Sequence, residues 1–203
     1  MKSSAFDDDR ESIHSWPQDF LRIGFGVIWV IDASLKWLPG FRATYASAVT
    51  TVAKGQPHWL KWWFDFWTRV QEPRPTAFAY MVAILETLVA LAILLGFARK
   101  LTYIVSALYG LMIWSVAEGF GGPYVKGSTD IGTGIIYTLV SVGLLTICYY
   151  AGVSRHSIDY HLERRVTWWW KLAEMRRPGR AAFGTRSAQD HASKERSAVP
   201  IGS

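Results

Sequence analysis

The apolar residues of this 203-residue sequence are gathered into blocks, which cover residues 20–38, 77–98, 101–117 and 131–153. A run of roughly 20 apolar residues is the length that an α-helix needs to cross a hydrocarbon core of roughly 30 Å. The pattern therefore predicts an all-α integral membrane protein. We expect residues 20–153 to form a bundle of four transmembrane helices.

The segments before and between these blocks are too polar to span a bilayer. Residues 1–19 hold an acidic run, Asp7 to Asp9, and lack the basic start and apolar core of a signal peptide, so we expect a cytoplasmic tail. Residues 41–76 are rich in Trp and Phe at helical spacing, which predicts an amphipathic, aromatic-rich outer loop with its rings at the lipid headgroups. A shorter helix is expected at 42–53, before a break at Gly55-Gln56-Pro57.

The C-terminal part of the chain is basic. Residues 154–177 combine Arg and Lys side chains with three adjacent tryptophans, Trp168 to Trp170. Three adjacent rings cannot all face one way, so this composition favours an amphipathic basic helix at the membrane surface, in contact with lipids. Residues 178–203 have little apolar content, and we expect them to be a disordered tail.

The basic residues also predict the orientation in the membrane. Most of the 22 Lys and Arg residues lie before the first block, between the second and third, or after the fourth. Because cytoplasmic loops carry an excess of such residues, we expect a multi-pass protein of the cell membrane with both termini in the cytoplasm. Arg22, Arg99 and Lys100 would then be topology anchors at the inner boundary. The net charge of +6 is interpreted as lipid contact, with no nucleic-acid partner.

Several ionisable residues interrupt the apolar pattern in the outer half of the predicted bundle. Asp32 and Lys36 are four apart, so they share a helix face and can pair. Glu86 has no basic residue within four positions, which leaves Lys36 as its plausible cation across the bundle. Glu118 directly follows the third block, and Asp130 directly precedes the fourth. Such groups are costly at membrane depth unless paired or hydrated, so they indicate a functional site, although a structural pair and a helix cap remain open.

Two loop residues belong with this cluster, and other chemistries fit poorly. Lys126 lies in the loop above the carboxylates, and Tyr124 could stack on a planar ring, although chance explains an aromatic residue there equally well. All five histidines fall outside the apolar blocks, which argues against haem, and we expect no haem or metal in this chain. Cys148 is the only cysteine, which excludes a dithiol relay within the chain.

Residues within the blocks resemble the DoxX/DoxD superfamily of four-helix membrane proteins over about residues 20–152. The similarity lies in Arg22-Ile-Gly24 with Trp29, Asp32 and Lys36, in Glu86 with Leu95-Gly96 and Arg99, and in Glu118-Gly119 with Asp130, Gly132 and Tyr137. The glycine-rich turn and the Asp130 stretch are most similar to DoxD. Ala33-Ser34 departs from the pattern, since many members have a glycine there.

The resemblance to DoxD implies a membrane subunit of a thiosulfate:quinone oxidoreductase, which oxidises thiosulfate to tetrathionate and reduces quinone. It implies a quinone as cofactor and a redox partner subunit. On this interpretation Glu86, Asp32 and Lys36 exchange protons or contact the quinone oxygens. Lys36 and Lys126 attract an anionic substrate from outside. The residues that bind this substrate are Glu118, Tyr124, Lys126 and Asp130. The alternative is a non-catalytic membrane anchor or assembly subunit of a larger redox complex.

Overall fold

The computed structural model describes residues 3–54, 56–122, 131–151, 157–163, 165–166 and 168–175, with side chains from Trp16 onward except that of Ala151. Within these ranges every regular element is a helix and no strand occurs, which confirms the all-α prediction. The α-helices are α1 (Ser3–Lys36), α2 (Pro39–Ala53), α3 (Lys61–Gln71), α4 (Pro75–Leu95), α5 (Arg99–Met112), α6 (Thr133–Ala151), α7 (Ile158–Glu163) and α8 (Trp170–Ala173). Short 3-10 turns cover His58–Leu60 and Gly119–Gly121, and a π-helical turn, Ile113–Ala117, extends α5.

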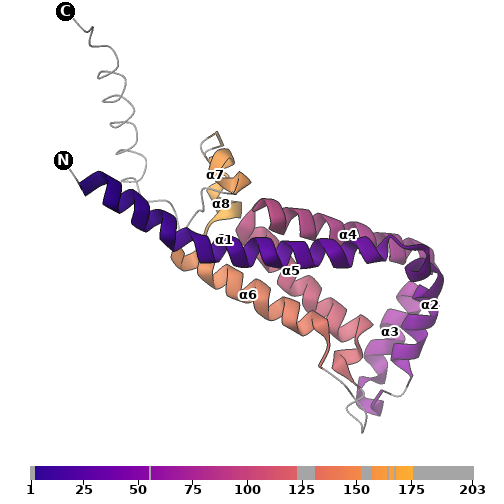
Figure 1. Cartoon of the computed structure of the whole chain (residues 1–203). Coiled ribbons are helices and arrows are strands. Elements are labelled where there is room, and N and C mark those ends of the chain that lie inside the picture. The colour runs from indigo at the N-terminus through magenta and orange to yellow at the C-terminus, as the bar shows by residue number, and fades with distance from the viewer. Residues whose placement is uncertain are drawn as a thin grey trace, which may run out of the picture.

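The long helices of the described chain pack as two antiparallel pairs. Helix α1 lies along α4, and α5 lies along α6, with further contacts from α4 to α5 and from α1 to α6 (Figure 1). Helices α2 and α3 cover the end at which α1 finishes and α4 begins. Helices α7 and α8 lie at the opposite end, beside the turn from α4 to α5 (Figure 1).

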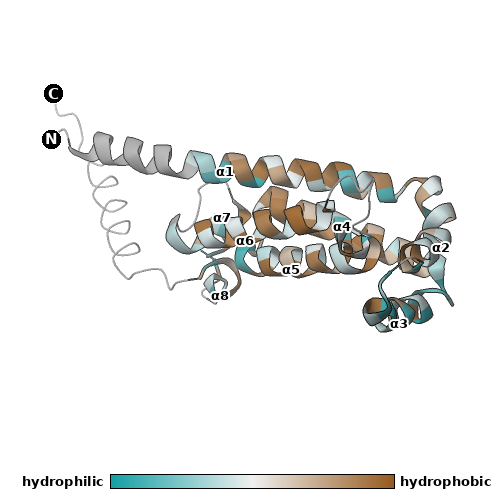
Figure 2. Ribbon diagram, turned by 90° about the horizontal axis from the view of Figure 1, so that it is seen from below, coloured by the Kyte–Doolittle hydropathy of each residue, from teal (hydrophilic) through white to brown (hydrophobic). Residues whose placement is uncertain are grey.

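Three helices in the described ranges are long and apolar enough to cross a membrane: Pro75–Leu95, Arg99–Ala117 and Thr133–Tyr150. They correspond to the second, third and fourth apolar blocks, and Figure 2 shows their mainly hydrophobic ribbons. The first block lies in α1, whose apolar half also carries Arg22, Asp32 and Lys36. Helix α1 begins at Ser3 rather than at residue 20, and Pro17 lies within it.

The helix pairs enclose an aromatic core. Trp29 of α1 is fully buried, and its ring lies 4.9 Å from that of Tyr137 and 6.1 Å from that of Tyr109. Phe25 meets Tyr137 edge to face, with the ring centroids 5.6 Å apart. Because these rings come from α1, α5 and α6, the contact joins the two helix pairs. Aromatic pairs of this geometry stabilise a fold beyond the area they bury.

Glycine allows the closest helix contact, between α5 and α6. A Cβ on Gly134 would lie 2.7 Å from the carbonyl oxygen of Gly110, and a Cβ on Gly110 would lie 2.6 Å from Thr138 Oγ1. Gly132, in turn, has a positive φ of 96° beside Glu118. Gly143 of α6, by contrast, has open space where its Cβ would lie.

The segment between α1 and α4 follows the predicted division into two short helices. Helix α2 covers the expected 42–53 region, and the chain leaves it before Pro57. Helix α3 is amphipathic, and together with the 3-10 turn before it exposes a line of aromatic side chains at helical spacing, Trp59, Trp62 and Phe66. Its other face is anchored, because Trp63 Nε1 donates a 3.3 Å hydrogen bond to the carbonyl of Ser115 in the π-helical turn.

The prediction of one continuous basic helix over residues 154–177 is wrong within the described residues. Helix α7 ends at Glu163, and only the single turn of α8 follows, from Trp170 to Ala173. The break has a physical cause, since Trp169 turns its indole Nε1 to donate a 2.9 Å hydrogen bond to Asp159. The chain thereby folds back over the α4–α5 turn instead of continuing along one axis. The expected tail, 178–203, lies outside the described residues.

Arg22 and Arg99, which were expected as topology anchors at the inner boundary, both have buried side chains. Arg22 donates hydrogen bonds to the carbonyls of Ile93 and Leu94 at the C-terminal end of α4 and pairs with Asp19. A cation at these carbonyls is favoured by the negative end of the α4 dipole. Arg99, at the start of α5, is described with the second charge cluster below.

Candidate functional site

The cluster of charges predicted for the bundle is present. Lys36 Nζ lies 2.9 Å from Asp32 Oδ1 on its own helix and 3.7 Å from Glu86 Oε2 on α4. The first distance follows from the four-residue spacing on α1. The second confirms that Lys36 is the cation that Glu86 meets across the bundle. We call Asp32, Lys36 and Glu86 the charge cluster.

Glu86 is the most enclosed member of the cluster, with 1% of its surface exposed. It lies on the same face of α4 as the buried Ala79, Ala83 and Ala90, whose small side chains let α1 approach. Tyr109 of α5 donates a 3.4 Å hydrogen bond to its Oε1. Oε2 has no hydrogen-bond partner among the described residues, although Lys36 lies near it. A buried carboxylate with an unused acceptor is costly, so this oxygen is a candidate position for a proton or a ligand.

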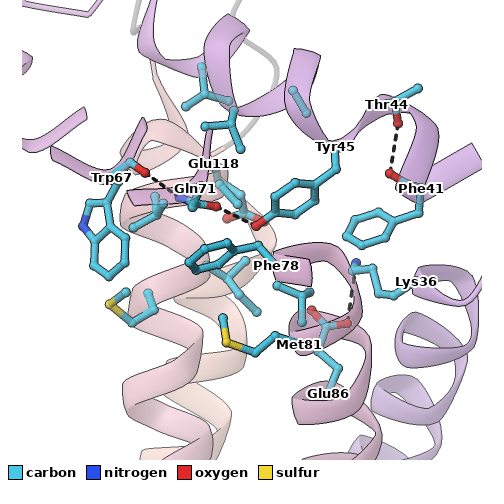
Figure 3. Close-up of a pocket in the computed structure, with 18 of the residues that line it drawn as sticks. Lys36, Phe41, Thr44, Tyr45, Trp67, Gln71, Phe78, Met81, Glu86 and Glu118 are labelled. Carbon is cyan, nitrogen blue, oxygen red and sulfur yellow. Dashed lines mark hydrogen bonds and ion pairs between the residues drawn. The ribbon is translucent and has the colours of Figure 1, made fainter. Parts of the chain in front are cut away.

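A cavity of about 330 Å³ adjoins the charge cluster. Lys36, Glu86 and Tyr109 form its polar floor, as Figure 3 shows for Lys36 and Glu86. The walls are mainly apolar and come from α2, α3, α4, the end of α5 and the π-helical turn. They include Phe41, Val49, Trp67, Phe78, Met81, Met112, Ile113 and Val116. The cavity therefore offers an apolar volume in which one end is charged.

Polar groups also line the cavity away from its floor. Tyr45 of α2 donates a 2.6 Å hydrogen bond to Gln71 Oε1 of α3, and Gln71 Nε2 donates a 3.2 Å bond to the carbonyl of Trp67. Burial raises the pKa of the Tyr45 hydroxyl, so that it remains a donor. Neither residue was identified from the sequence. In the sequence, each is only a single polar side chain on a short amphipathic segment, which does not distinguish it from an exposed residue.

Glu118 lines the same cavity, but its carboxylate has a structural partner. Oε1 accepts hydrogen bonds from the backbone N–H and the hydroxyl of Thr133, at 3.1 and 2.6 Å, and Oε2 accepts a 2.9 Å bond from the N–H of Gly134. Glu118 therefore caps the N-terminus of α6, where a negative charge is favoured. In the sequence, a cap of this helix by Asp130 was one of the alternatives left open. Asp130, Lys126 and Tyr124 lie outside the described residues.

A second cluster of buried charges lies at the opposite end, and sequence reasoning did not find it. Asp159 of α7 is 0% exposed and accepts a 3.2 Å ion-pair contact from Arg99 Nε, which is itself 1% exposed. It also accepts hydrogen bonds from the N–H groups of Ala98 and Arg99, at 2.7 and 2.9 Å, and thereby caps α5. Nearby, burial and then the charge of Glu174 raise the pKa of Glu163 to about 7.

No group of three or more His, Cys, Asp or Glu side chains that could hold a metal ion occurs among the described residues. Cys148 is buried with its Sγ 3.5 Å from the carbonyl of Ala173, and is a packing residue in this structure. No protein-family model, curated protein or solved structure matches the chain. The function must therefore be argued from the charge cluster and its cavity.

Proposed function

We propose that this protein is the membrane subunit of a quinone-linked redox system, with the quinone ring in the cavity beside the charge cluster. The observation that carries the proposal is Glu86, a carboxylate enclosed within the described helices yet facing a cavity with apolar walls. Strongly enclosed ionisable groups in such cavities commonly mark functional sites.

The residues that are present fit a quinone. Phe78 and Met81 offer apolar wall surface for a flat ring, and Lys36 supplies a charged donor at the cavity floor. A bound quinone takes up two electrons and two protons to become a quinol. Glu86 Oε2 would hold and transfer a proton at the floor, and Lys36 would compensate the charge that changes with each transfer. Asp32 would keep Lys36 in place through their 2.9 Å contact.

For the electron source we propose thiosulfate, which is the donor implied by the resemblance to DoxD. Two thiosulfate ions lose one electron each and join through a new S–S bond as tetrathionate. The two electrons released equal the two that a quinone accepts. A redox partner subunit would deliver them, and the Lys126 loop would present positive charge to the anion.

We further propose that α1 is a fourth transmembrane helix, so that the bundle spans the membrane four times. Its outward face carries a continuous line of exposed apolar side chains, which suits contact with lipid; it includes Phe20, Ile23, Val27, Ile31 and Leu35. Its charged side chains point instead to partners within the bundle: Arg22 to the end of α4, and Lys36 to Glu86. Charges that are paired inside a bundle are compatible with a spanning helix.

A non-catalytic role as membrane anchor or assembly subunit is the second candidate. It is favoured by the exposed aromatic face of the His58–Leu60 turn and α3, where Trp59 and Trp62 are 71% and 66% exposed. Such a face suits either the lipid interface or a partner subunit. In that role the charge cluster would only stabilise the contact between α1 and α4.

The substitution Glu86→Gln distinguishes the two roles, because it keeps the shape and removes the titratable proton. If Glu86 transfers protons, quinone-linked activity in membranes should fall by roughly 100-fold or more while the protein accumulates normally. The matched control is Glu72→Gln, an exposed carboxylate that follows α3, which should retain full activity. In the anchor role, Glu86→Gln should instead lower thermal stability, and Lys36→Met should restore it. Full stability with full activity would contradict both roles.

A further inference from the structure

The cavity has a second polar region, formed by Tyr45 and Gln71 and called here the Tyr45–Gln71 pair. The two side chains come from α2 and α3, and each lines the cavity. Gln71 is only 5% exposed, and its amide carries two N–H donors, of which one bonds to the carbonyl of Trp67. The Tyr45 hydroxyl fixes the amide orientation by donating to Oε1 at 2.6 Å. One N–H of the amide therefore remains for a ligand.

This pair and the charge cluster are separated by apolar wall. Phe78, Val82 and Glu86 recur at four-residue spacing along α4 and all line the cavity. Eight residues of helix correspond to about 12 Å, so the wall is long enough to lie along a ring and its substituents. Figure 3 shows Phe78 and Met81 between the Tyr45–Gln71 pair and Glu86. The polar groups of the cavity thus lie at both ends of an apolar passage.

We propose that the Tyr45–Gln71 pair binds a second oxygen of the ligand, so that the cavity selects ring compounds with an oxygen at each end, such as 1,4-diones. This inference rests on the proposed function and names the ligand class for the same site. Lys36 binds the first oxygen, and the remaining N–H of Gln71 donates to the second. An amphiphile with one polar end leaves the Gln71 donor without a partner and binds less tightly.

Equilibrium dialysis of the purified full-length protein in detergent tests this with two ring compounds of similar size. The first is 1,4-naphthoquinone, and the second is 1-tetralone, which has a single carbonyl. We expect the wild-type protein to bind the dione about tenfold more tightly, the scale of one well-placed hydrogen bond. In Gln71→Leu the ratio of the affinity for 1,4-naphthoquinone to that for 1-tetralone should fall to about one. The affinity for 1-tetralone itself should change less than about twofold. Glu86→Gln should weaken the binding of both compounds.

The control variant is Thr44→Val. Thr44 lines the same cavity from α2, but its hydroxyl donates a 2.9 Å bond to the carbonyl of Gly40, so the preference should stay at its wild-type value. An equal affinity of the wild-type protein for the two compounds would overturn the inference without any variant. A preserved preference in folded Gln71→Leu would do the same and leave the proposed function intact. If neither compound binds the wild-type protein, the proposed function itself fails.

Discussion

Replacing Asp159 with alanine should destabilise the protein more than any exposed charge substitution. The side chain accepts four contacts: from Arg99 Nε, from the N–H groups of Ala98 and Arg99, and from Trp169 Nε1. Its removal leaves the Arg99 guanidinium enclosed without its carboxylate, and the start of α5 loses its cap. Breaking a buried ion pair in this way costs about 3–5 kcal/mol. For a chain of this size that corresponds to a drop of roughly 6–20 °C in Tm.

Thermal unfolding of the purified protein in detergent, followed by circular dichroism, measures this drop. The double variant Asp159→Ala with Arg99→Met should recover part of it, because the buried guanidinium is then removed together with the carboxylate. The matched control is Asp65→Ala. Lys61 and Asp65 are closer, at 2.8 Å, but 61% and 42% exposed, so the loss should stay below about 1 kcal/mol. A Tm for Asp159→Ala within about 2 °C of the wild-type value would refute the view that Asp159 stabilises the fold as the cap of α5 and the ion-pair partner of Arg99.

Three further outcomes are expected. Protease added to intact spheroplasts should spare an epitope placed after Ser203, because both termini are expected in the cytoplasm. The contribution of Glu163 to stability should be fully present below about pH 4.5 and be lost as the pH rises through about 7, because burial and then the charge of Glu174 raise its pKa in the fold. Unfolding of Glu163→Gln should therefore depend less on pH across this range than unfolding of the wild-type protein. Gly134→Ala should cost about 1–3 kcal/mol, because its Cβ meets the Gly110 carbonyl, whereas Gly143→Ala should stabilise α6 by up to about 1 kcal/mol in the same unfolding assay.

The two contacts of the charge cluster could be predicted from the sequence, one from residue spacing along a helix and the other from the expected depth of the two side chains in the bundle. The pairing of Asp32 with Lys36 follows from helical spacing alone. The meeting of Lys36 with Glu86 follows from their similar depth in antiparallel helices, and the 3.7 Å contact confirms it. The division of the segment after α1 into two short helices followed equally from local signals, a helical aromatic spacing and the break at Gly55-Gln56-Pro57.

The remaining features depend on contacts between distant parts of the chain. Asp159 caps a helix that begins 60 residues earlier, and nothing near Asp159 in the sequence indicates that partner. Glu118 caps α6 across a loop, and its spacing from Thr133 and Gly134 in the sequence does not indicate that contact. Local composition also predicted a continuous helix for 154–177, but the bond from Trp169 to Asp159 outweighs helix propensity there. Tertiary contacts of this kind override weak local preferences.

The two buried carboxylates, Asp159 and Glu86, differ in a way that separates structure from chemistry. Both oxygens of Asp159 accept hydrogen bonds, from Ala98 and Trp169 on one and from Arg99 on the other, so a proton on either would break an existing contact. Glu86 accepts one long bond from Tyr109, and its other oxygen has no hydrogen-bond partner within the described chain and lies beside a cavity. A carboxylate whose acceptors are all used serves the fold. One that keeps an unused acceptor next to an apolar cavity has room for a proton and a ligand, which is why the proposed chemistry is placed at Glu86.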